Sequence, residues 1–121
     1  MTVFSAKKAK KTVTREQAIA DGTLINLSGA YPDIPAYHRH PVACTSEVWQ
    51  IIVEAEKDPH CCNTRIEMVW DLMYMSVSKA TEQINENEHL FKFTVMEEDY
   101  TLKSVLHYGD EGEHVITIKT R

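Results

Sequence analysis

The chain of 121 residues is 43% hydrophobic and 26% charged, and its formal net charge is −5. This length suits a single domain whose apolar core is stable without disulfide bonds. No apolar run approaches the roughly 18 residues of a membrane-spanning helix. The odd cysteine count, with Cys61 beside Cys62, is untypical of a secreted disulfide framework. We therefore expect a cytoplasmic protein without a membrane partner.

Charge is distributed unevenly along the chain. The first eleven residues hold four lysines: Lys7, Lys8, Lys10 and Lys11. The rest of the chain holds the nine other basic residues and all eighteen acidic ones, which leaves a net charge of −9. We expect residues 1–12 to form a flexible lysine-rich leader and residues 13–121 to form one domain. An acidic body repels nucleic acid, so direct nucleic-acid binding is not expected and a basic protein partner is favoured.

A short helix and a strand open the ordered part. Thr14 and Gln17 stand at the spacing of a capping box, and Gly22 supplies the left-handed residue that ends a helix. The short apolar segment 23–27 then predicts a strand.

Residues 28–41 are predicted to form an irregular loop, because one glycine and three prolines oppose regular structure. The loop carries five aromatic or basic residues: Tyr31, Tyr37, His38, Arg39 and His40. Long loops in small domains are often functional. This loop is therefore a candidate recognition surface, and packing of its tyrosines over the sheet is the alternative.

Two helices are predicted next. The first runs from a cap at Thr45 or Ser46 to Asp58, which precedes a proline and is therefore disfavoured within a helix. The second and longest spans Asn63 to Ile84. Its apolar residues recur every three or four positions: Ile66, Val69, Trp70, Met73, Val77, Ala80 and Ile84. This spacing predicts that all of them, the tryptophan included, face the core.

After residue 84 the apolar period changes from 3.6 to 2, which predicts strands. Segments 90–96, 100–108 and 114–120 alternate, with turns at residues 97–99 and 109–112. Short connections between consecutive strands predict an antiparallel meander. With the strand after Gly22, we expect an α+β fold. It would hold an antiparallel sheet of about four strands, packed against two main helices and a short N-terminal helix.

Four blocks of the sequence resemble those of one protein family. They are TREQAIADGTLI at residues 14–25, HPVACT at residues 40–45 followed by Trp49, the pair Trp70-Asp71, and GDEGEHVITI at residues 109–118. The family comprises small uncharacterised proteins carried by bacteria, phages and plasmids. The resemblance brings no assigned activity or catalytic residues. It implies an accessory role, such as antagonising a host defence in the manner of an anti-CRISPR inhibitor.

Histidine and cysteine residues raise the alternative of a small metal- or thiol-dependent enzyme. His38, His40 and His60, with the vicinal cysteines, could supply zinc ligands, but the usual Cys-x-x-Cys and His-x-x-x-His spacings are missing. Cys44 lies just before a predicted helix, where a thiolate is stabilised. It could act as a nucleophile with His38 or His40 as its base, or pack as a small apolar residue.

Carboxylates form a further set of candidates. Glu67 and Asp71 lie four residues apart on one helix face, as acid–base pairs can. Glu67 is also explained by a capping box with Thr64, and Asp71 by pairing with a cation or a backbone amide. Three acidic groups lie near strand or helix ends: Glu82, Glu86 and Glu88; Glu97, Glu98 and Asp99; and Asp110, Glu111 and Glu113. They are either solvated turns or one face that engages a basic protein.

We therefore expect a non-enzymatic protein-binding module that uses no metal or other cofactor. The expected binding residues are Tyr31, Tyr37, His38, Arg39 and His40 of the loop and Glu97, Glu98, Asp99, Asp110 and Glu111 of the turns. The partner would be a host or phage protein, for example a nucleic-acid-binding complex, and homodimerisation is an alternative.

Overall fold

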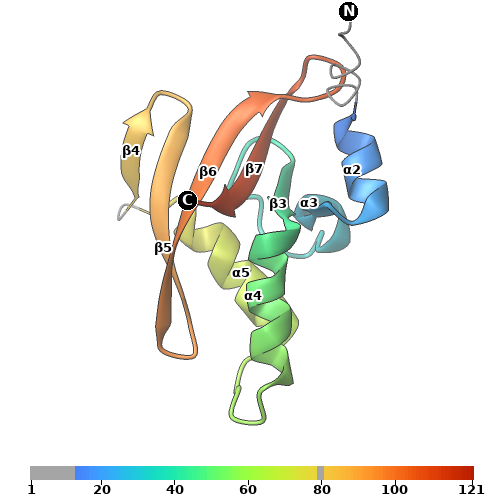
Figure 1. Ribbon diagram of the computed structural model, residues 1–121. Helices are drawn as coiled ribbons and strands as arrows, with labels where there is room; N and C mark the ends of the chain where they lie inside the picture. The colour runs from blue at the N-terminus through green and yellow to red at the C-terminus, as the bar shows by residue number, and fades with distance from the viewer. Residues whose placement is uncertain (1–12, 79–80) are drawn as a thin grey trace, which may run out of the picture.

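The computed structural model describes residues 13–78 and 81–121, so the predicted leader lies outside the described residues (Figure 1). The described helices are α2 (Arg15–Asp21), α3 (Leu27–Ala30), α4 (Ser46–Lys57) and α5 (Arg65–Met75). The described strands are β2 (Leu24–Asn26), β3 (Val42–Thr45), β4 (Glu82–Asn85), β5 (Glu88–Val95), β6 (Glu98–Tyr108) and β7 (His114–Thr120). Among these described helices, none is long and apolar enough to cross a membrane.

Side chains cap the helices as their sequences predict. Thr14 Oγ1 accepts a hydrogen bond from Gln17 N at 3.0 Å, and the Gln17 side chain accepts one from Thr14 N, which completes a capping box. Thr64 and Glu67 form the same box at the start of α5. Gly22, with a φ of 87°, ends α2 in the left-handed conformation. These local predictions are confirmed.

The strands form one mixed sheet in the order β2-β3-β7-β6-β5-β4. The fold is α+β, and β5, β6 and β7 form the expected antiparallel meander. The predicted sheet of about four antiparallel strands is nevertheless wrong. β3 pairs in parallel with β7, with Val42 opposite Ile116, and antiparallel with β2, while β4 extends the sheet beside β5.

Two of these strands, β3 and β4, are not among the four expected from the sequence. All of Val42, Ala43 and Cys44 in β3 are buried, so the strand lacks the alternation that marks a half-exposed strand. The predicted helix from Asn63 to Ile84 is too long, because α5 ends at Met75 and β4 follows. Ile84 continues the helical spacing by coincidence and is exposed on β4.

The core lies between the sheet and two helices that cover one of its faces (Figure 1). α4 packs against β3 and β7, and α5 packs against β5. The largest fully buried side chains of this core include Phe93, Leu27, Ile52, Leu72, Leu102 and Ile118.

At the β5–β6 connection the turn is Met96–Glu97, one residue before the predicted turn. Both residues have positive φ, 52° and 66°, as two-residue hairpins of type I′ require.

Candidate functional site

Helix α5 exposes an apolar stripe along its solvent side, and Val77, two residues beyond its end at Met75, continues the stripe. Ile66, Trp70, Tyr74 and Val77 recur at intervals of about one turn, and Trp70 and Tyr74 are 41% and 51% exposed. The opposite side of the helix holds its buried residues: Met68, Val69, Leu72 and Met73. In the sequence, the exposed and the buried residues share one helical spacing and therefore look like a single wide apolar band. The prediction that Trp70, Ile66 and Val77 face the core is therefore wrong, and position 80 lies outside the described residues.

Tyr37, in the loop before β3, contacts both aromatic residues of the stripe. Its hydroxyl accepts a hydrogen bond from Trp70 Nε1 at 2.7 Å. Its ring lies edge-on to Tyr74, with ring centroids 5.6 Å apart and an interplanar angle of 76°. Edge-to-face packing of this kind is favourable for aromatic rings. The stripe and Tyr37 together, residues 66, 70, 74, 77 and 37, are called the aromatic face below.

An unpaired carboxylate lies beside the aromatic face. Asp71 follows Trp70 in α5, and no side chain or amide of the described residues is hydrogen-bonded or ion-paired to it. The cation or amide partner expected for Asp71 is therefore not found within the described residues. Desolvation by partial burial raises the pKa of this carboxyl group. A carboxylate in this state is stabilised when a cation approaches it.

The loop also borders a pocket of about 330 Å³, which lies between the end of α5 and the helix-covered face of β5, β6 and β7. Four of the five loop residues singled out in the sequence line this pocket: Tyr37, His38, Arg39 and His40. The fifth, Tyr31, packs instead against Trp49, with ring centroids 6.3 Å apart. The structure thus brings most of the predicted loop residues to one place.

His38 and Ser76 lie together in this pocket but are not arranged as a base and its nucleophile. Ser76 Oγ donates to Met73 O at 2.7 Å, so the contact of 2.7 Å between His38 Nε2 and Ser76 Oγ has the histidine as donor. Burial, followed by the proximity of His40 and His89, lowers the pKa of His38 to about 4. A neutral imidazole that donates to a hydroxyl does not take its proton.

Cys44 is a packing residue of the core. It is 0% exposed, and burial raises the pKa of its thiol to about 12. A cysteine nucleophile must be deprotonated and accessible, so Cys44 is unsuited to that role. His60 lies apart from the pocket in the exposed α4–α5 connection, where its ring contacts Asp58. Within the described ranges, no group of three or more His, Cys, Asp or Glu residues is arranged to hold a metal ion.

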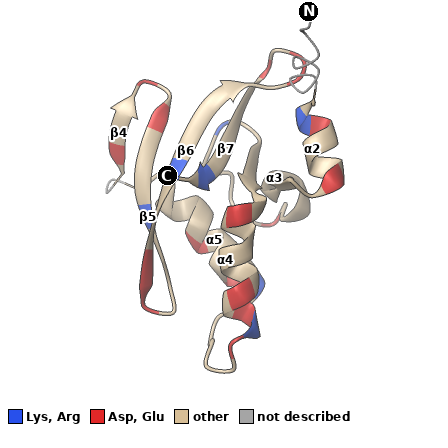
Figure 2. Ribbon diagram, in the orientation of Figure 1, with Lys and Arg blue, Asp and Glu red and all other residues tan. Residues whose placement is uncertain are grey.

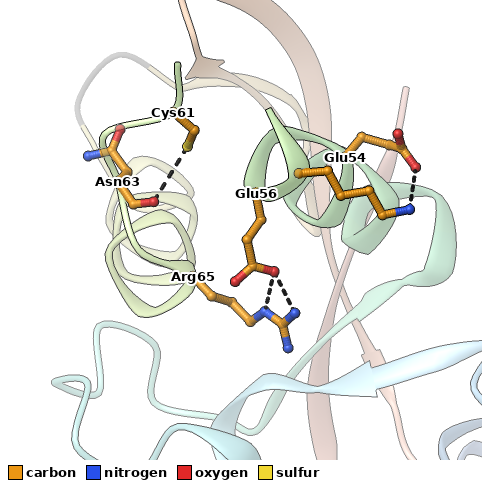
Figure 3. A network of polar contacts seen from close by, with 6 residues as sticks. Glu54, Glu56, Cys61, Asn63 and Arg65 are labelled. Atoms are coloured by element: carbon orange, nitrogen blue, oxygen red, sulfur yellow. Dashed lines mark hydrogen bonds and ion pairs between the residues drawn. The ribbon is translucent and has the colours of Figure 1, made fainter. Parts of the chain in front are cut away.

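Polar contacts brace the corner between α4 and α5 (Figure 3). The Cys61 thiol donates to the Asn63 carbonyl, with 3.4 Å between sulfur and oxygen. Arg65 Nε donates to Glu56 Oε1 at 3.1 Å, and its guanidinium lies 5.6 Å from the ring centroid of Trp49. Cys61 therefore has a structural contact in this corner. The charge of Arg65 is directed to α4 rather than to the aromatic face.

Two of the acidic turns lie at opposite ends of β6 and do not form one surface with each other (Figures 1 and 2). Glu97 and Glu98 belong to the β5–β6 end, and Asp110 and Glu111 belong to the β6–β7 end. Asp99 Oδ2 lies 3.6 Å from Lys92 Nζ, so its charge is partly compensated within the hairpin. The alternative of a single acidic face across all the turns does not fit this geometry.

Asp110 has a structural function at the start of α2. Its carboxylate accepts hydrogen bonds from the backbone amides of Arg15 at 2.7 Å and Glu16 at 3.0 Å. These amides belong to the first turn of a helix and have no partner within it. The two hydrogen bonds lower the pKa of Asp110. The residue therefore connects the β6–β7 turn to α2.

Comparison with known proteins places the chain in a family. One family model matches residues 1–120. The chain belongs to the family of unknown function DUF6573. Its resemblance to a family of uncharacterised proteins is thereby confirmed. No curated protein and no solved structure matches this DUF6573 chain.

Several residues at the site of this DUF6573 protein are not predicted as site residues from the sequence. Tyr74, Ser76, His89 and Ser104 carry no motif, and the loop brings them together only through the tertiary fold. One signal was available for His89, because it has the same strand phase as Phe91 and therefore points to the helix-covered side. For Tyr74, the signal was the number of apolar residues around α5. They cover more of the helix surface than one buried face can hold, so some of them must be exposed.

Proposed function

We propose that this protein is a non-enzymatic binding module that docks a protein partner on its aromatic face. The observation that carries the proposal is the exposed pair Trp70 and Tyr74, both held by Tyr37. Tryptophan and tyrosine supply much of the binding energy in protein interfaces. Side chains that are already positioned lose little conformational entropy when a partner binds. An apolar row on one helix suits a groove on the partner.

Charges beside the aromatic face favour a partner with a basic rim. Glu67 and Asp71 each follow a stripe residue on α5, so the two carboxylates run along one side of the stripe. Asp71 has no partner among the described residues, and Arg65 is occupied by Glu56. The chain beyond residue 11 has a net charge of −9. The partner surface is therefore an apolar patch bordered by lysine or arginine residues.

Within this proposal, the protein acts as an accessory protein of a phage or plasmid that inhibits a host defence, as an anti-CRISPR protein does. The four sequence blocks support this origin. A defence complex that binds nucleic acid carries basic surfaces, which an acidic protein can occupy. The loop contributes to docking through Tyr37, and the distant acidic turns assist encounter rather than form the contact.

The proposal is tested by quantitative capture from a lysate of the bacterium that hosts the phage or plasmid. Wild type is compared with Tyr74→Ala and with Asp71→Lys. The matched control is Tyr108→Ala, which removes an aromatic residue that is 70% exposed at the far end of β6. We expect wild type and the control to retain one protein or complex that Tyr74→Ala and Asp71→Lys lose. Less of it should be bound at high salt.

Two results would contradict the proposal. The first is a set of captured proteins that does not differ between the variants. The second is a concentration-dependent dimer that Tyr74→Ala abolishes, because the aromatic face would then bind a second copy of the chain.

A further inference from the structure

The pocket beside the aromatic face contains a buried hydroxyl group without a partner. Ser104 in β6 is 5% exposed and lines the pocket. No hydrogen bond joins its side chain to any residue that the structure describes. Buried hydroxyl groups are nearly always hydrogen-bonded to protein or to ordered water, so one that lines a cavity without a protein partner marks a place where a water molecule or a ligand atom can bind.

Two histidines place further hydrogen-bonding atoms around Ser104. His89 is the cross-strand neighbour of Ser104, and their side chains share one face of the sheet. His38 donates from Nε2 to Ser76, as described above, so the Nδ1 atom of its neutral ring is an acceptor. No described residue donates to this Nδ1 atom. The pocket is thus lined by a hydroxyl group without a partner among the described residues and by the imidazole rings of His38 and His89.

The other lining residues define the chemistry of the ligand. Four of them carry flat rings: Tyr37, His38, His40 and His89. The charged members are Arg39 and Glu86, whose formal charges cancel. A volume of about 330 Å³ lies at the small end of the range of ligand sites, which starts near 300 Å³. These features suit a small, planar, uncharged ring that has both hydrogen-bond donors and acceptors.

We propose that this pocket binds a nucleobase, presented as a free nucleoside. The base lies among the tyrosine and histidine rings, and its polar edge hydrogen-bonds to Ser104 and to His38 Nδ1. The proposal does not depend on the protein partner proposed above. Tyr37 and Val77 border both the pocket and the aromatic face, whereas Ser104 and His89 belong to the pocket.

The test is calorimetric titration of the full-length protein with adenosine, guanosine, cytidine and uridine. We expect saturable binding of at least one nucleoside, with its 5′-monophosphate binding no more tightly, because the pocket has no net positive charge. Ser104→Ala should weaken that binding about tenfold, the effect of losing one hydrogen bond to a buried group. The same variant should raise the thermal midpoint of the free protein by a few degrees, since it removes an unsatisfied hydroxyl group.

Two further variants complete the test. Thr101→Ala, at an exposed position on the opposite face of β6, should leave both binding and thermal midpoint unchanged. His89→Ala, in a protein that keeps Ser104, should also weaken binding. Absence of saturable binding for all four nucleosides at millimolar concentration overturns the proposal. Equal affinity of Ser104→Ala and wild type, or tighter binding of the monophosphate, also overturns it.

Discussion

Tyr37 accepts a hydrogen bond from Trp70 at 2.7 Å and thereby ties a proline-rich loop to a helix 33 residues further along the chain. The contact explains two features together. Residues 28–30 of the predicted loop belong to α3, whereas residues 31–41 form neither helix nor strand and yet acquire a fixed position over α5. The tryptophan remains 41% exposed yet has its indole N–H satisfied by protein. A side chain of this kind is better suited to recognition than to core packing.

The first prediction concerns the stability of Trp70→Ala. Because the side chain is only partly buried, we expect a loss of about 2 kcal/mol in the free energy of unfolding, measured by urea denaturation. Phe93→Ala, at a fully buried position, should cost about 3–5 kcal/mol. If the two variants lose the same amount, Trp70 belongs to the core and the aromatic face is not a free surface.

The second prediction concerns the three cysteines, which are all free thiols. In the folded protein, Cys44 should resist a thiol reagent at pH 8, because it is fully buried and burial raises its pKa to about 12. Cys61 and Cys62 should react without denaturant, since Cys61 is partly exposed and Cys62 exposed. Mass spectrometry of the labelled peptides gives the answer. Rapid labelling of Cys44 in the native protein would reopen its candidacy as a nucleophile.

The third prediction concerns pH. The pKa of His38 falls from an ordinary 6.5 to about 4 on folding, through burial and through its neighbours His40 and His89. Between these two pH values the unfolded chain binds a proton at His38 that the folded protein does not bind. The contribution of the neutral His38 side chain to the free energy of unfolding is therefore complete above pH 6.5 and is lost as the pH falls toward 4. The urea midpoint of wild type should therefore fall more between pH 7 and pH 4.5 than that of His38→Gln. Equal decreases would contradict the assignment.

The fourth prediction separates a structural carboxylate from a solvated one. Asp110→Ala should accelerate hydrogen exchange of the α2 amides, because the amides of Arg15 and Glu16 lose their acceptor. Glu111→Ala removes the same charge from the neighbouring position and should leave α2 unchanged. Equal acceleration in both variants would indicate a general charge effect of the turn.

Local signals in the sequence predict a good part of this fold, because they depend on neighbouring residues. The capping box at Thr14, the left-handed Gly22 and the three C-terminal strands are of this type. The parallel pairing of β3 with β7 has no local signal, since it joins residues more than seventy positions apart, such as Val42 and Ile116. The same pairing enlarges the sheet beyond the expected four strands.

The candidate site is predictable in part for the same reason. Prolines and aromatic residues mark the 28–41 loop as a recognition segment, and the structure brings its residues 37–40 to one pocket. The residues against which the loop packs are set by the tertiary structure and cannot be predicted from the local sequence. Helical spacing alone does not distinguish the buried Val69 from the exposed Trp70, because both belong to apolar rows of α5. The choice depends on the angle at which the helix meets the sheet.

The most direct test of the central claim is the affinity of the captured partner, once purified, for Tyr74→Ala relative to Tyr108→Ala. Both variants remove an exposed tyrosine, but only Tyr74 belongs to the aromatic face. The docking account predicts that Tyr74→Ala weakens binding at least tenfold, about 1.4 kcal/mol or more, and that Tyr108→Ala binds as wild type does. Unchanged affinity of Tyr74→Ala, with its fold intact, would contradict the account.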